Sequence, residues 1–165
     1  MTPDLPHAVY VEALETYAGG RTAVFLAGGI TNCPDWQAEA RASLADLPIA
    51  ILSPRRARFP IRDPDAAAGQ VAWEFEHLRR ADTVLFWFPA SGEAVQPIAL
   101  YELGAHAATG KPMTVGADPG YLRRDDVVLQ LGHVRPELQV YASLSDTVAA
   151  MRHLIRALEQ DRLPR

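Results

Sequence analysis

The stretch Thr83-Val-Leu-Phe-Trp-Phe88 (TVLFWF) is the most strand-like run in the chain. β-Branched and aromatic residues favour strands, and a continuous apolar run is typical of a strand buried on both faces. Four other stretches predict further strands, and a fifth at the N-terminus is a candidate for one more. They are residues 23–27, 49–52, 113–115 and 138–141, with 8–13 as the N-terminal candidate.

Helical patterns alternate with these runs. The predicted helices are 36–45 (N-cap Asp35), 70–80 (apolar stripe Val71, Phe75 and Leu78), 97–110, and one from Ser143 or Ser145 to Leu158. Strands that alternate with helices predict an α/β fold, a three-layer sandwich around a central, mostly parallel five-stranded sheet. A length of 165 residues suits a single domain, 1–165, with its core at about 21–158.

The composition disfavours several classes of protein. Sixteen Lys and Arg against twenty Asp and Glu give a net charge of −4, whereas nucleic-acid binding requires a basic face. No apolar run approaches the ~20 residues that span a bilayer. The single Cys33 suits a reducing cytoplasm, and no pair of histidines beside it has zinc spacing. We therefore expect a cytoplasmic protein that binds no nucleic acid, no membrane and no metal.

Three segments follow predicted strand ends, where open parallel sheets bind their ligands. They are Gly28-Gly29, Pro54-Arg55-Arg56 and residues 89–97. Asp82 precedes its strand, so we interpret it as a structural residue at the opposite edge. The glycine pair does not belong to a GxGxxG fingerprint, and no GxxxxGK[ST] motif occurs, which argues against dinucleotide and P-loop sites.

Two glutamates have apolar neighbours. Glu102 lies near the start of a predicted helix, with Ile98 and Ala105 at helical spacing. Glu74 borders an expected apolar stripe, beside a Trp73 that could cover a flat ligand. Two such carboxylates in one pocket would suit glycosidic chemistry, in which one attacks the anomeric carbon and the other protonates the leaving group. The structural alternatives are an acid that complements the helix dipole and a boundary glutamate paired with a base.

Residues 55–69 are rich in Arg, Pro and Asp and predict a long loop, a kind of segment that is often functional. Arg55 and Arg56, at its start, could hold a phosphate, a carboxylate or a base edge. The alternative is that both arginines are solvated.

Six stretches resemble, in order, the nucleoside 2-deoxyribosyltransferase-like family. They cover roughly residues 23–128 and read VFLAGGI, DWQAEA, SPRRARF, WEFEHLRRADTVLFWFP, QPIALYELG and GKPMTVGADPGYLRRDDV. The resemblance implies a flavodoxin-like fold. It also implies a nucleoside or nucleotide and a nucleobase as substrates, with no cofactor.

The resemblance also implies roles for single residues. Glu102, in the ELG stretch, would be the nucleophile that attacks the sugar C1′, and Glu74 would assist at the nucleobase. Gln96 stands where the transferases carry an acid and the related nucleotide hydrolases often carry a serine, which leaves the 5′ contact open. Further substrate contacts are implied at Gly28, Gly29, Trp36, Arg55, Arg56, Phe59 and Trp73.

The family completes its sites across a subunit interface, which implies a homodimer or a higher homo-oligomer. Residues 118–130 mix apolar and charged side chains, as an interface with a polar rim does. Arg124 and Asp126 are our candidates for residues donated to a neighbour's pocket. We therefore expect cleavage of an N-glycosidic bond, with transfer to another base or to water. The alternatives are a nucleoside 5′-monophosphate N-hydrolase and a non-catalytic nucleotide-binding module.

Overall fold

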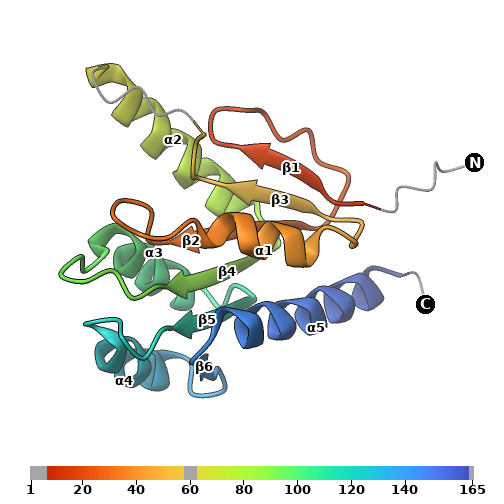
Figure 1. Ribbon diagram of the computed structural model, residues 1–165. Helices are drawn as coiled ribbons and strands as arrows, with labels where there is room; N and C mark the ends of the chain where they lie inside the picture. Colours follow the sequence, from red (N-terminus) through yellow and green to blue (C-terminus); the bar gives the residue numbers. More distant parts are fainter. Residues whose placement is uncertain (1–6, 58–62, 164–165) are drawn as a thin grey trace, which may run out of the picture.

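A parallel sheet of six strands forms the centre of the computed structural model, which describes residues 7–57 and 63–163 (Figure 1). The strands are β1 (Val9–Glu12), β2 (Ala23–Gly28), β3 (Ala50–Ser53), β4 (Thr83–Phe88), β5 (Met113–Ala117) and β6 (Val140–Tyr141). The helices are α1 (Trp36–Leu44), α2 (Pro64–Arg80), α3 (Pro97–Ala107), α4 (Arg124–Val134) and α5 (Leu144–Arg162). The predicted α/β sandwich is confirmed.

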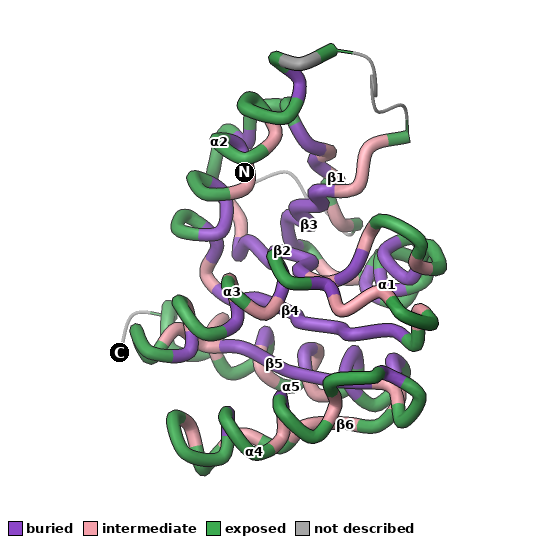
Figure 2. The backbone as a smooth tube through the Cα atoms, turned by 90° about the vertical axis from the view of Figure 1, so that its left-hand side faces the viewer, coloured by how far each residue is buried: buried purple, intermediate pink, exposed green. Residues whose placement is uncertain are grey.

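Helices cover both faces of the sheet, and the buried strands lie between them (Figure 2). On one face, α2, α3 and α4 pack over Val84, Phe86 and Phe88 of β4. On the other face, α1 and α5 pack over Leu85 and Trp87. Because successive side chains of a strand point to opposite faces, both faces of β4 must be apolar, which explains the unbroken TVLFWF run.

The strand order is β1-β3-β2-β4-β5-β6. Without β1 it is the 2-1-3-4-5 order of flavodoxin-like folds, in which the order reverses between the strands that are here β2 and β4. The expected count of five strands was one too low, because the N-terminal candidate does pair with β3, with Val9 opposite Ala50. The sheet therefore begins before the expected core boundary at residue 21.

Helix α2 begins at Pro64, six residues before the predicted start, so part of the expected loop 55–69 is helical. The carboxylate of Asp63 accepts a hydrogen bond from the Asp65 backbone N–H, and proline suits the first helical position because it has no N–H to satisfy. The Asp-Pro pair is thus a helix start and not part of the predicted loop.

The predicted apolar stripe of α2 was wrong for two of its three residues. Val71 and Phe75 are each 64% exposed, and Leu78 is buried. The buried side instead carries Trp73, whose ring stacks on His77 at 4.0 Å and whose indole N–H donates to the Glu15 carbonyl at 2.8 Å. Burial of the larger tryptophan ring turns Val71 and Phe75 towards solvent.

Asp82 is structural, as expected, at the edge opposite the strand carboxyl ends. Its carboxylate accepts from the Ala23 backbone N–H at 2.7 Å and pairs with Arg162 near the end of α5. At the start of α5, Ser143 is the N-cap and accepts from the Asp146 N–H at 3.0 Å. Within the described residues, every helix is too short or too polar to span a bilayer.

Candidate active site

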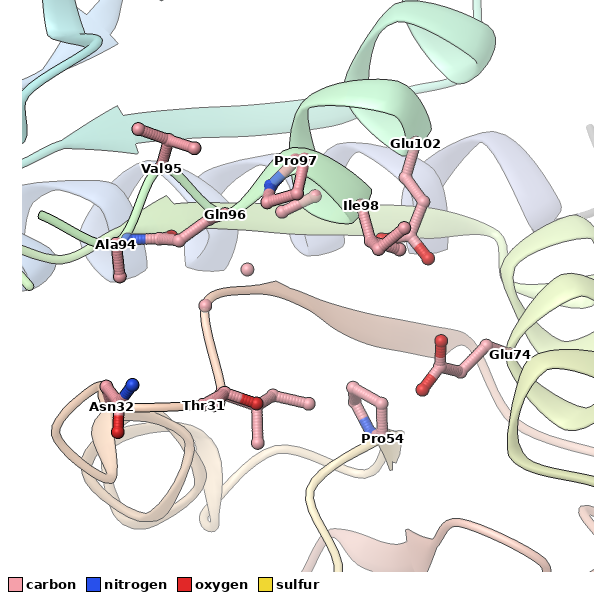
Figure 3. Close-up of a pocket in the computed structure, with 14 residues that line it drawn as sticks. Thr31, Asn32, Pro54, Glu74, Ala94, Val95, Gln96, Pro97, Ile98 and Glu102 are labelled. Carbon is pink, nitrogen blue, oxygen red and sulfur yellow. The ribbon is translucent and has the colours of Figure 1, made fainter. Parts of the chain in front are cut away.

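A cavity of about 340 Å³ lies beyond the carboxyl ends of β2 and β4, where the strand order reverses (Figure 3). Its described lining is residues 28–32, 54, 74, 94–99 and 102. These come from the loop after β2, the end of β3, the middle of α2, and the β4–α3 connection with the first turns of α3. The size falls within the ~300–1,000 Å³ typical of small-molecule sites.

Two carboxylates face each other across this cavity (Figure 3). Glu102 projects from α3 and Glu74 from α2, and both are half-buried. Burial, followed by the negative charge of Glu74, raises the pKa of Glu102 to about 8. Burial also raises the pKa of Glu74. With its pKa raised to about 8, Glu102 keeps its proton near neutral pH, beside the negative charge of Glu74.

Gln70 holds Glu74 in place and was not among the predicted site residues. Its amide N–H groups donate to the Glu74 carboxylate and to the Pro54 carbonyl, each at 2.7 Å. The bond to the carboxylate favours the ionised form and so opposes part of the rise in the pKa of Glu74. The spacing of four residues on one helix was the available sequence signal.

Gly28 and Gly29 line the cavity with backbone, and neither position has room for a side chain. A Cβ on Gly28 would lie 2.0 Å from the Trp87 carbonyl oxygen, and one on Gly29 would lie 2.5 Å from the Gln96 amide oxygen. Trp36 supports this loop from behind, because its indole N–H donates to the Gly29 carbonyl at 2.9 Å. Trp36 is therefore buried outside the described lining of the cavity.

Arg55 is a clamp for the loop that follows β2. One terminal guanidinium nitrogen, Nη2, donates to the carbonyls of Ile30, Cys33 and Pro34 at 3.1, 3.2 and 3.0 Å. Its Nε donates to the Gln37 side chain at 2.9 Å. Through these contacts Arg55 holds the loop that forms part of the cavity wall. Arg55 itself is not part of the described lining.

Arg56 lines a different cavity, of about 310 Å³, together with Arg55, Arg41 and Tyr10. Trp73 also lies outside the described lining of the cavity that holds the two glutamates, in the core against His77. Phe59 falls outside the described residues. The structure therefore brings Glu102, Glu74, Gly28, Gly29 and Gln96 to one cavity and places Trp36, Arg55, Arg56 and Trp73 elsewhere.

Gln96 is a buried, strained residue of the cavity wall. Its backbone is left-handed, with φ 50° and ψ 55°, a conformation that costs a non-glycine residue ~1–2 kcal/mol. Its amide N–H groups donate to the Pro89 carbonyl and the Ser91 hydroxyl at 3.0 and 2.9 Å. The side chain thus ties the loop after β4 to the start of α3, and its amide oxygen lies beside Gly29.

Arg124 and Asp126 lie at the start of α4, outside the described lining of their own chain's cavity. Arg124 donates to the Ala117 carbonyl at 3.1 Å, and Asp126 pairs with Arg123 at 3.3 Å. Much of the apolar content of residues 118–130 is buried within the chain, since Tyr121 and Val127 pack in the core. Donation of Arg124 and Asp126 to a neighbour stays a prediction.

The described lining of the cavity contains no Lys, Arg or His, so its two glutamates carry its only side-chain charges. Neutral hydrogen-bonding groups come from Thr31, Asn32 and Gln96, and the remaining surface is largely aliphatic. Such a site suits a small ligand without negative charge that has both hydrogen-bonding groups and apolar surface.

A family model described as nucleoside 2-deoxyribosyltransferase like matches residues 21–121. This range is more than half of the 165 residues and contains every described residue of the cavity lining. A search of curated proteins found no match. The chain belongs to the nucleoside 2-deoxyribosyltransferase-like family.

Proposed function

We propose that this protein cleaves the N-glycosidic bond of a (deoxy)nucleoside through a covalent glycosyl–Glu102 intermediate. The observation that carries the proposal is the pair of carboxylates facing each other in a cavity of nucleoside size. The family of the chain points the same way, to glycosyl transfer on nucleosides. The two acids suffice for the chemistry, and the proposal invokes no cofactor.

The reaction would take two steps. First, an ionised Glu102 oxygen bonds to C1′ of the sugar while the bond from C1′ to the base nitrogen breaks, and Glu74 gives its proton to the departing base. Then the nitrogen of a second base, or a water, attacks C1′ and passes its proton to Glu74 as the glutamyl ester bond breaks. Both carboxyls regain their starting states.

The pair must carry one proton for the first step. Because the higher pKa, about 8, is that of Glu102, this proton rests on Glu102 near neutral pH and must move to Glu74 before Glu102 attacks. This requirement predicts a bell-shaped dependence of kcat/KM on pH. At low pH both carboxyls are protonated and no nucleophile remains. This acid limb of the profile lies above pH 4.5, the ordinary pKa of a glutamate, because burial raises both pKa values. Above about pH 8, both carboxyls are ionised and no general acid remains. A kcat/KM that still rises beyond pH 9 would contradict the shared proton.

The cavity favours a nucleoside over its 5′-monophosphate. A phosphate dianion would meet two carboxylates and no cation of the described lining, and like charges at close range repel. Arg55, the first candidate for a phosphate contact, is held by the loop carbonyls. Hydrolysis of a nucleoside 5′-monophosphate is therefore the second candidate function.

A substrate panel tests the proposed function. The protein is incubated with nucleosides, deoxynucleosides and their 5′-monophosphates, each with and without a free acceptor base, and the products are separated by chromatography. We expect release or exchange of the base from nucleosides. A clear monophosphate preference that disappears in Arg56→Ala would instead establish the hydrolase. Binding without turnover of any substrate would establish a non-catalytic module.

A further inference from the structure

A second cavity, of about 310 Å³, lies between α1 and the carboxyl ends of β1 and β3. We call it the arginine cavity, because three of its described lining residues are arginines. The described lining is Tyr10, Glu12, Asp35, Ala38, Arg41, Arg55, Arg56 and Ala57. None of these residues belongs to the described lining of the substrate cavity, the one that holds Glu74 and Glu102. The two cavities are therefore distinct.

The arginine cavity is positively charged, although the whole chain carries a net charge of −4. Three guanidinium groups face two carboxylates in its described lining, which leaves a net charge of +1. The described lining of the substrate cavity holds two carboxyl groups and no cation. A cavity whose charge opposes that of the molecule around it concentrates anions.

Both carboxylates of the arginine cavity are engaged by groups of the protein. Asp35 caps α1, where it accepts a hydrogen bond from a first-turn backbone N–H at 3.1 Å, and it pairs with Arg55 at 3.4 Å. Glu12 accepts from the Ala57 backbone N–H. These contacts fix the two carboxylates in place and leave the charge of Arg41 without a carboxylate partner.

Arg41, in the last turn of α1, is held by a ring instead. Its guanidinium carbon lies 3.8 Å from the centre of the Tyr10 ring. Within residues 7–57 and 63–163, Arg41 forms no ion pair. Contact with the ring covers one face of the guanidinium and leaves the N–H groups along its edge for a ligand.

We propose that the arginine cavity binds a phosphate group, as inorganic phosphate or as a small phosphate monoester. A guanidinium group donates two parallel, charge-assisted hydrogen bonds to phosphate oxygens, which makes arginine the preferred side chain for this anion. The volume of about 310 Å³ lies at the lower end of the ~300–1,000 Å³ typical of small-molecule sites. It therefore suits a phosphate with at most a compact group attached.

This site does not depend on the proposed function. The proposed reaction uses the carboxyl groups of the substrate cavity, whereas phosphate would be held by guanidinium groups of the arginine cavity. Binding of phosphate is measured without a nucleoside, so either proposal can fail while the other stands.

The test is isothermal titration calorimetry at constant ionic strength, with inorganic phosphate and with glycerol 3-phosphate as the two probes. The wild type is expected to bind at one saturable site, with a dissociation constant in the millimolar range or below. Arg41→Ala is expected to weaken binding on the order of tenfold, the effect of losing a charge-assisted hydrogen bond. Because Arg41 is exposed and alanine favours helices, this variant should fold, which circular dichroism would check.

Arg79→Ala is the matched control. Arg79 is also an exposed helical arginine over an aromatic ring, 5.5 Å from the centre of Phe75, but it lies on α2 outside the described lining of the arginine cavity. Its replacement removes the same charge and should leave the dissociation constant unchanged. Glu74→Gln tests the location, because phosphate in the substrate cavity would bind more tightly once the charge of Glu74 is removed.

The two probes distinguish the sources of the phosphate group. Binding of inorganic phosphate alone would identify free phosphate as the ligand, and binding of glycerol 3-phosphate would identify a monoester. Absence of saturable binding of both probes to the wild type would overturn the proposal. It would also be overturned by unchanged binding in Arg41→Ala, by equal weakening in Arg79→Ala, or by tighter binding in Glu74→Gln. If Arg41→Ala were unfolded, Arg41→Gln would replace it and be judged by the same outcomes.

Discussion

Replacing Glu102 by glutamine is expected to lower kcat/KM on the order of 10⁴-fold or more. The amide has the shape of the carboxylate but cannot supply the oxygen nucleophile, and covalent catalysis depends on that one atom. Since Glu102 lies on a regular helix and lines a preformed cavity, substrate binding should suffer far less than turnover. The loss should therefore fall mainly on kcat.

Intact-protein mass spectrometry with a slow 2-fluoro nucleoside measures the intermediate directly. The wild type should gain the mass of one fluorinated sugar, and Glu102→Gln should gain nothing. Glu93→Gln is the matched control, because Glu93 is an exposed glutamate in the loop before α3 and should behave like the wild type. A sugar adduct on Glu102→Gln, or retained activity, would refute the assignment.

The Glu102→Gln variant should be at least as stable to unfolding as the wild type. A pKa raised from 4.5 to about 8 in the folded protein means that ionised Glu102 destabilises the fold, with an effect that grows as pH rises from 4.5 and is complete above 8. Neutral glutamine lacks this penalty. A higher midpoint of thermal unfolding at pH 8 than the wild type would therefore exclude misfolding as the cause of lost activity.

The sheet and the place of the cavity were predictable from the sequence because they depend on strong, local signals. The run in β4 is apolar on both faces since helices cover both, and β2 ends in two glycines that have no room for a Cβ. Once a parallel sheet is predicted, the reversal of strand order fixes the edge at which ligands bind. The two glutamates then stood out by their apolar neighbours.

The orientation of α2 could not be predicted in the same way. Its sequence carries two overlapping apolar stripes, one through Val71 and Phe75 and another through Trp73 and His77. Periodicity does not rank two stripes on one helix. The stack of Trp73 on His77 and the bond from its indole to Glu15 decide which side is buried, and both depend on tertiary contacts.

Arg55 shows a second limit of sequence reasoning. An arginine after a strand end suits an anion, yet its partners here are three backbone carbonyls whose directions depend on the path of residues 30–34. No residue pattern encodes carbonyl directions in an irregular loop. Gln70, in contrast, was within reach of sequence reasoning, because it lies one helical turn before Glu74.

Replacing Glu74 by glutamine is expected to lower kcat/KM by ~10²–10⁴-fold for ordinary nucleosides, the usual effect of losing a general acid. The loss should shrink for a nucleoside with an activated leaving base, such as an N7-methylated purine, which departs without a proton. Without Glu74 no general acid remains to be lost at high pH, and its charge no longer raises the pKa of Glu102. The fall in kcat/KM above about pH 8 should therefore disappear, and the lowered kcat/KM should stay level at alkaline pH.

The measurement compares ordinary and activated nucleosides with the wild type, Glu74→Gln and Glu76→Gln across pH. Glu76 is the matched control, an exposed glutamate of α2 that pairs with Arg80 outside the described cavity lining, and its loss should change neither rate nor pH profile. Equal losses for both classes of leaving base in Glu74→Gln would remove the proton-donor role. Glu74 would then contribute by holding the base, with its carboxylate fixed by the hydrogen bond from Gln70 at 2.7 Å. The glutamine that replaces Glu74 in the variant could keep part of the contact with the base.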